Sequence, residues 1–455
     1  MDMAAHPVER PFQVTHRRVL GIALPMTLAY LSTPLLGLTD LAVIGRLGDP
    51  ALLGGITVGG IIFSLVFSAF NFLKIGTTGL TAQALGAGDD VEQRAVLMRA
   101  SAIAIALGFA LVLLQVPILF LSMLAVGASS AVEAATTDYY TVRILAAPLT
   151  LLNYALLGWF LGLGRAGMGL LLQTVLNGVN IALSILFVLG LGWGIAGAAW
   201  ATVIAEGIAA LAGLAVAGRQ LGFRIGAPLQ VLMARDQLLR LFAMNRDILI
   251  RTFCLIAAFW MFTRAGAQQG DVILAANGVL FNMFFLGSYF LDGLATAAEQ
   301  LTGRAKGARH RLAFEQAVKL PILWGFVLSG TVSAILLLAG GLMIDVISAS
   351  EEVRATARVF LIWAALSPLA GVLAFQFDGV FIGATWSQDM RNMMVLSLGL
   401  FVLTWQVAEP LIGNHGVWLA LHVFLGARGL TLWWRYRVRI EEDFPKHSAG
   451  SALLR

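Results

Sequence analysis

In the stretch TPLLGLTDLAVIGRLGD, residues 33–49, one aspartate, Asp40, has uncharged and mainly apolar neighbours for a turn or more on each side. The nearest charged residues along the chain are Arg18 and Arg46. A helix needs about 20 apolar residues to cross the hydrocarbon core of a bilayer, and residues 19–44 provide that length. The stretch therefore predicts a membrane-spanning helix with an acid inside it.

The same apolar pattern recurs along the whole chain. Of its 455 residues, 59% are hydrophobic and 12% are charged, whereas a soluble domain carries about 25% charge. This composition predicts an all-α integral membrane protein with twelve transmembrane helices. The predicted spans are residues 19–44, 52–80, 96–124, 139–163, 168–190, 194–217, 244–264, 272–299, 320–347, 357–384, 393–411 and 414–434.

Basic residues predict the orientation. They gather before the first span, between the sixth and seventh spans and after the last span, as Arg17, Arg18, Arg219, Arg224, Arg235, Arg240, Arg246, Arg435, Arg437 and Arg439. The positive-inside rule then puts both termini in the cytoplasm of a multi-pass protein of the inner (plasma) membrane. Because the basic residues are explained as topology signals, we expect no nucleic-acid partner.

The two halves of the chain repeat each other. LTAQALGA at 80–87 matches LTGRAKGA at 301–308, and GWFLGLG at 158–164 matches GVFIGAT at 379–385, both at an offset of 221 residues. Six spans per repeat return the chain to its starting side, which predicts two lobes related by a pseudo-twofold axis along the membrane normal. The predicted parts are a tail at 1–18, an N-lobe at 19–217, a linker at 218–243, a C-lobe at 244–434 and a tail at 435–455.

Familiar catalytic motifs are absent from the sequence. It has no G-x-x-x-x-G-K-[ST] loop, no H-E-x-x-H and no G-x-S-x-G, and its one cysteine is Cys254. We therefore expect no enzyme activity, no cofactor and no metal site. An intramembrane transferase stays as a lower-ranked alternative, although it would need a clustered His/Asp or Asp-rich motif.

Acids within the spans are the first functional candidates, because a carboxylate at membrane depth is costly and usually functional. Asp40 is expected to handle a proton or a cation, the alternative being an acid that snorkels or caps a helix end. Glu206 is expected near the cytoplasmic end of its span, in contact with solvent. The C-lobe candidates are Asp292 and Glu299, two turns apart, and Asp378. Either aspartate could instead neutralise a basic residue, Lys74, Arg251 or Arg428.

Polar residues add further candidates. Asn177, Asn180 and Ser184 share one helix face, where they either form a site or join helices by hydrogen bonds. Asp389 and Arg391 lie at the predicted cytoplasmic exit of a span and are candidates for a cytoplasmic gate.

Five stretches together resemble one family. PLLGLTDLAVIGRLGD, GWFLGLGRAG, GLGWGIAGAAWATVIAE, FLDGLATAAEQLTGRAKGA and FDGVFIGATWSQDMRNMM are similar to the MATE (multidrug and toxic compound extrusion) family, in its DinF-like branch. The resemblance covers about residues 15–435 and implies two six-helix lobes that export organic, often cationic, compounds in exchange for protons or sodium ions.

The resemblance also implies site residues. Asp40 matches the first-span aspartate that couples proton movement to substrate release in this branch, and Tyr139, Asn180 and Thr202 match the family's N-lobe polar cluster. Ser184 stands where the family has a second aspartate. This departure puts sodium coupling in doubt, because a hard cation prefers several oxygen ligands that include charge.

The sequence thus predicts a monomeric, proton-coupled exporter of small organic cations that works by alternating access. A sodium-coupled exporter remains an alternative. So does a lipid-linked sugar flippase of the same superfamily, which would favour several deep cationic residues to hold a pyrophosphate.

Overall fold

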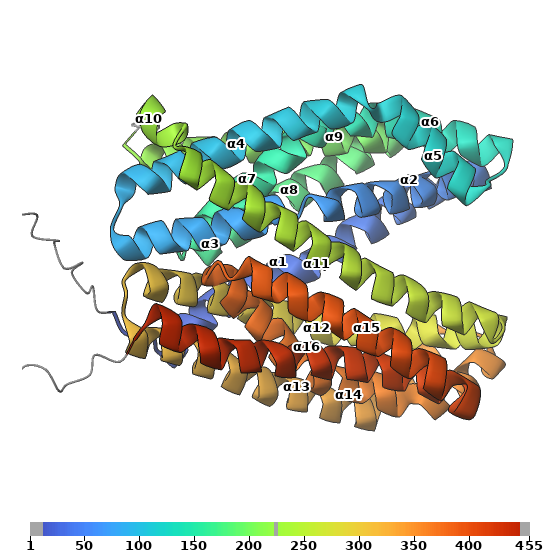
Figure 1. The fold of residues 1–455 in the computed structure, drawn as a ribbon. Helices are drawn as coiled ribbons and strands as arrows, with labels where there is room; N and C mark the ends of the chain where they lie inside the picture. Colours follow the sequence, from blue (N-terminus) through green and yellow to red (C-terminus); the bar gives the residue numbers. More distant parts are fainter. Residues whose placement is uncertain (1–11, 223–225, 446–455) are drawn as a thin grey trace, which may run out of the picture. The chain divides into compact units, whose positions relative to one another are not determined.

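The computed structural model describes residues 12–222 and 226–445. Twelve of its helical segments are long and apolar enough to cross a membrane, which confirms the predicted fold class (Figure 1). Arg224, one of the basic residues used to predict the orientation, lies outside the described residues.

Two compact units divide the chain. The N-terminal unit is formed by Leu20–Thr252, and the C-terminal unit mainly by the chain from Phe253 onward. The N-terminal unit contains most of α1 (His16–Gly45), then α2 (Pro50–Ala69), α3 (Phe72–Ala87), α4 (Asp90–Leu113), α5 (Gln115–Val126), α6 (Ser130–Arg143), η1 (Ile144–Ala146), α7 (Ala147–Gly162), α8 (Ala166–Ser184), the π-helical turn η2 (Ile185–Gly190), α9 (Gly194–Gln220) and α10 (Leu229–Leu232).

The C-terminal unit contains fewer and longer helices. They are the later part of α11 (Arg235–Gln268), α12 (Asp271–Gly307), α13 (Arg311–Ile347), α14 (Glu351–Gly383), α15 (Ser387–Ile412) and α16 (Asn414–Asp443). Its core is aromatic: Phe262, Phe401 and Trp418 are almost fully buried, and the Phe262 and Trp418 rings meet edge to face at 4.9 Å.

Two predicted spans are interrupted in the structure. The segment 52–80 is divided at residues 70–71, between α2 and α3. The segment 96–124 is interrupted at Leu114, where α4 ends and the short helix α5 begins. Pro117 lies in the first turn of α5, where its missing N–H costs no helical hydrogen bond. Apolarity alone could not reveal the break at Leu114, because the residues on both sides of it are apolar.

The sequence repeat is also a repeat of helix packing. In the N-terminal unit α7 crosses α3 so closely that a Cβ on Gly158 would lie less than 3.0 Å from the carbonyl oxygen of Lys74. In the C-terminal unit α14 crosses α12 in the same way, with Gly379 against the carbonyl oxygen of Ala295. Both members of the second pair lie 221 residues after those of the first, so small residues permit the same close crossing twice.

Helix ends follow the same offset. Ser129 caps α6 by accepting from the N–H of Val132, and Ser350 caps α14 by accepting from the N–H of Val353. The turns after α7 and α14 also correspond, since Gly164 and Thr385 both have positive φ, 73° and 55°. The offset of 221 therefore holds from the start of α6 to the start of α8, and it allows positions in the two units to be compared one by one.

Candidate functional site

Asp40 is buried inside the N-terminal unit. It lies on α1, whose interior also contains Pro25 and Pro34, and 8% of its surface is exposed. One of its carboxylate oxygens, Oδ1, accepts a hydrogen bond from the Ser184 hydroxyl on α8 at 3.0 Å.

A chain of hydrogen bonds continues from Ser184. Its hydroxyl also lies 3.4 Å from Oδ1 of Asn180, whose amide donates to the Thr202 hydroxyl on α9 at 2.8 Å. Thr202 donates in turn to the backbone carbonyl of Ala198. The structure thus joins four predicted residues from three helices, and we call Asp40, Ser184, Asn180 and Thr202 the polar chain.

Two other predicted residues lie beside the polar chain. The Asn177 amide donates to the Ser32 hydroxyl at 2.9 Å, so it joins α8 to α1 separately. Tyr139, on α6, is buried with its ring edge-on to Phe63 at 6.1 Å. Its hydroxyl interacts with the Arg143 side chain and with the charge of Asp40, so Tyr139 lies beside the polar chain.

Arg143 is a residue that the sequence analysis missed. It ends α6, one turn after Tyr139, and only 11% of its side chain is exposed. Its Nη2 lies 3.9 Å from Oε1 of Glu206, and its guanidinium lies over the rings of Phe63 and Phe67, at 5.2 and 5.4 Å. Its charge also acts on Asp40.

Glu206 does not lie where the sequence analysis put it. The prediction of a solvent-exposed end was wrong: Glu206 is in the middle of α9 and is buried. The Asn153 amide on α7 donates to its Oε2 at 2.7 Å and to its backbone carbonyl at 3.0 Å. Glu206 is buried because α9 packs against α7 and α6 at this level, which no apolar pattern along α9 reveals.

The acids of the C-terminal unit are in a different setting. Asp378 on α14 pairs with Arg428 on α16, which donates through Nε at 3.2 Å and also through Nη2. Of the two readings left open for Asp378, a site residue or an acid paired with a basic residue, the structure shows the ion pair. On α12, Asp292 is half-buried and Glu299 is buried, and their roles stay a prediction.

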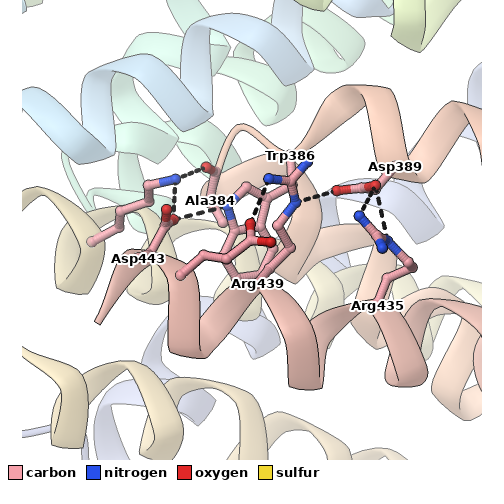
Figure 2. A network of polar contacts seen from close by, with 8 residues as sticks. Ala384, Trp386, Asp389, Arg435, Arg439 and Asp443 are labelled. Atoms are coloured by element: carbon pink, nitrogen blue, oxygen red, sulfur yellow. Dashed lines mark hydrogen bonds and ion pairs between the residues drawn. The ribbon is translucent and has the colours of Figure 1, made fainter. Parts of the chain in front are cut away.

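Asp389 lies in an ion-pair cluster at one end of the C-terminal unit (Figure 2). It accepts from Arg435 at 3.0 Å and from Arg439 at 2.5 Å, both on α16. Nearby, Asp443 accepts from the Trp386 indole at 2.9 Å. Arg391 donates to the amide oxygen of Asn392 at 2.8 Å. The cluster ties the start of α15 to the end of α16, and a gating role stays a prediction.

The repeat provides an internal comparison for this site. At the offset of 221 residues, the polar positions of the N-terminal unit correspond to apolar residues in the C-terminal unit. Tyr139, Arg143, Asn153, Asn177, Asn180 and Ser184 correspond to Phe360, Ala364, Ala374, Leu398, Phe401 and Trp405. The shared helix packing therefore forms without these polar groups.

Comparisons with known proteins agree with one family over most of the chain. The MatE family profile matches residues 25–186 and 248–405. The DNA damage-inducible protein F of Escherichia coli is 39% identical over 412 residues, which cover 90% of each chain. A probable multidrug resistance protein NorM of Caulobacter vibrioides is 27% identical over 453 residues, 93% of each chain.

Solved structures share the fold. A multidrug resistance MATE family transporter of the MOP superfamily, in an outward-facing conformation, matches with a TM-score of 0.79 and 20% identity. The match covers 94% of this chain and 96% of that structure's chain.

Proposed function

The chain belongs to the MatE family, and from this premise we propose that it is a secondary antiporter that exports small organic cations in exchange for protons by alternating access. The observation that carries the proposal is Asp40, a buried acid whose described hydrogen-bond partner is a neutral hydroxyl. Because no ion pair within residues 12–222 and 226–445 fixes its charge, its carboxylate can exchange a proton for a cationic substrate.

Competition at Asp40 would couple the two movements. A proton neutralises the carboxylate and removes its attraction for a cation, whereas a bound cation favours the charged form. Transport further requires that the two conformations hold proton and substrate with different affinities. Pro25 and Pro34 interrupt the hydrogen bonding of α1 and give this helix places to bend as the conformation changes.

Ser184 gives the site a way to respond to that proton. A hydroxyl has one proton to donate and two lone pairs that accept, and Ser184 has two acceptors within reach, Asp40 at 3.0 Å and Asn180 at 3.4 Å. With Asp40 charged, Ser184 donates to it. With Asp40 protonated, the carboxyl can donate to Ser184, whose own proton then turns to Asn180.

The composition of the polar chain supports protons over sodium ions. Its four residues provide one carboxylate, one amide and two hydroxyl groups, since Ser184 stands where the resembled family has an aspartate. A sodium ion here would have a single charged ligand, which is a weak site for a hard cation.

The remaining parts of the proposal follow from the same family membership. We place the protein in the inner membrane as a monomer with both termini in the cytoplasm. Organic cations are its partners in transport, and no resident cofactor is needed.

The test is ethidium movement in proteoliposomes that contain the full chain. A pH gradient and a sodium gradient are imposed separately, with wild type and Asp40→Asn compared in each. We expect the pH gradient to drive ethidium transport in wild type only. Ethidium binding should also weaken as the pH falls, because protonation removes the negative charge of Asp40, and Asp40→Asn should lack this dependence.

Two results would contradict the proposal. Transport driven only by sodium would move the coupling site away from the polar chain, toward acids such as Asp292 or Glu299. Normal pH-driven transport by Asp40→Asn would show that another group carries the proton.

A further inference from the structure

Arg143 is held in an unusual way for a buried arginine. A guanidinium stays charged in proteins and has five N–H donors to satisfy. Within the described parts of the N-terminal unit, its Nη1 is buried and has no hydrogen-bond partner. Its ion pair with Glu206 is long at 3.9 Å, and its other polar neighbour is the Tyr139 hydroxyl. A charge removed from water with so few partners is costly.

The aromatic rings of Phe63 and Phe67 next to Arg143 lower the cost of burying its charge, but they provide no hydrogen-bond acceptor. The rings of Phe63 and Phe67 stack at 5.7 Å and present their faces to the guanidinium. Such contacts contribute about 0.5–2 kcal/mol. Because they involve no directional hydrogen bond, the guanidinium can change its position over the two rings. The Glu206 carboxylate, in contrast, is held by a hydrogen bond from the Asn153 amide to its Oε2, and the same amide also donates to the Glu206 backbone carbonyl. The fixed partner is therefore the acid, and the arginine is the movable one.

The fold does not require this arginine. The corresponding position in the C-terminal unit is Ala364, which is fully buried in the same helix packing. Glu206 and Asn153 would lose their cationic neighbour without Arg143, but the helices would retain their small-residue crossings.

Four charged side chains act on this part of the N-terminal unit. The charges of Arg143 and Glu206 both act on Tyr154, together with that of Lys74, and Arg143 acts on Asp40. Lys74 itself lies 5.1 Å from the ring of Tyr30. When Asp40 and Glu206 are ionised, their two negative charges balance the positive charges of Arg143 and Lys74. An incoming cation therefore competes with a cationic side chain that is already present.

We propose that Arg143 is a resident counter-cation that exchanges between Glu206 and Asp40 and competes with the cationic substrate for Asp40. This inference rests on the proposed function. While Glu206 holds Arg143, Asp40 is open to an organic cation or a proton. When the substrate leaves, Arg143 can move toward Asp40 and prevent the same cation from rebinding. Arg143 and Glu206 are then positioning residues that set the affinity for positive charge.

The proposal predicts opposite effects for its two residues. Arg143→Gln removes the competitor and should tighten ethidium binding by about tenfold, the order expected for one charge acting through the protein interior. Glu206→Gln releases Arg143 toward Asp40 and should weaken binding by a similar factor. Arg143→Lys keeps the charge and should restore most of the wild-type affinity.

A third variant loosens the same contact without changing any charge. Asn153→Ala removes the hydrogen bond that holds the Glu206 carboxylate, so it should weaken ethidium binding in the direction of Glu206→Gln, but less. It keeps the proposal testable if either charge variant fails to fold. Thermal unfolding and gel filtration identify such failures.

The measurement is fluorescence polarisation of ethidium with the purified full chain, and the neutral dye Nile red is the control for charge. Opposite shifts for ethidium with unchanged Nile red binding would support the proposal. Equal shifts of both dyes, or shifts in the same direction for Arg143→Gln and Glu206→Gln, would overturn it, because a structural role predicts them. If wild type binds ethidium through Asp40 but Arg143→Gln changes nothing, this inference alone fails. If wild type binds no ethidium, the proposed function fails with it.

Discussion

Replacing Gly158 by alanine tests the tight helix crossing of the N-terminal unit, and Gly379→Ala tests its repeat in the C-terminal unit. In each case the new methyl group would lie less than 3.0 Å from a backbone carbonyl oxygen of the facing helix. A carbonyl oxygen cannot rotate away as a flexible side chain can. The two helices must therefore separate by about 1 Å to reach the 3.4 Å at which ordinary contact begins.

The size of the effect follows from the cost of overpacking. Extra methylene groups in a well-packed core cost about 1–3 kcal/mol, and a rigid backbone neighbour puts both variants at the upper end. For a unit of this size, 1 kcal/mol corresponds to about 2–4 °C in Tm. We therefore expect each variant to lower Tm by about 6–12 °C.

Thermal unfolding of the purified protein, followed by tryptophan fluorescence, measures the effect. Gly60→Ala and Gly278→Ala are matched controls, because an added methyl group at either position meets no atom within 4 Å. Alanine favours a helix over glycine, so the controls should leave Tm unchanged or raise it. If Gly158→Ala or Gly379→Ala has the same Tm as the controls, the helices do not cross as closely as the structure shows.

Three further predictions concern polar residues. Asp378→Asn leaves Arg428 buried without its counter-charge and should lower the free energy of unfolding by about 3–5 kcal/mol. The double variant Asp378→Leu with Arg428→Met should recover most of that loss. Equal Tm values for the single and the double variant would contradict the buried ion pair. Ser184→Asp adds a second carboxylate to the polar chain and should make ethidium transport respond to a sodium gradient, and an unchanged ion dependence in proteoliposomes would refute this. Asp389→Asn weakens the contacts with two partly exposed arginines, so it should cost about 1 kcal/mol or less. It should also speed hydrogen exchange in the last turns of α16, and unaltered exchange there would show that the ion pairs of Asp389 do not hold the end of α16 to α15.

The helices and half of the site could be predicted from the sequence. Apolar length located the twelve spans, because a bilayer requires that length whatever the tertiary packing. Asn180 and Ser184 were found together because a spacing of four residues puts two side chains on one helix face. The resemblance added Thr202, and all three belong to the polar chain that includes Asp40.

The other half of the site depends on tertiary packing. Arg143 follows the polar run TTDYYT and reads as a residue of a helix end at the membrane surface, although Phe63 and Phe67 cover it. A signal was available in the repeat, since an arginine that corresponds to Ala364 departs from the pattern of its own fold. Glu206 was misplaced because its partner, Asn153, lies 53 residues away on another helix.

The repeat finally separates what the fold needs from what transport needs. Two stretches of one chain build the same helix crossings and the same helix caps, yet one of them has Asn180 and Ser184 where the other has Phe401 and Trp405. A hydrogen bond between helices in a membrane contributes only about 0.6 kcal/mol. Such bonds are a poor reason to keep a buried acid and the polar chain around it, since the aromatic version of the same packing is already present in the molecule. The polar groups of the N-terminal unit are best explained by the ions and cations that the protein moves.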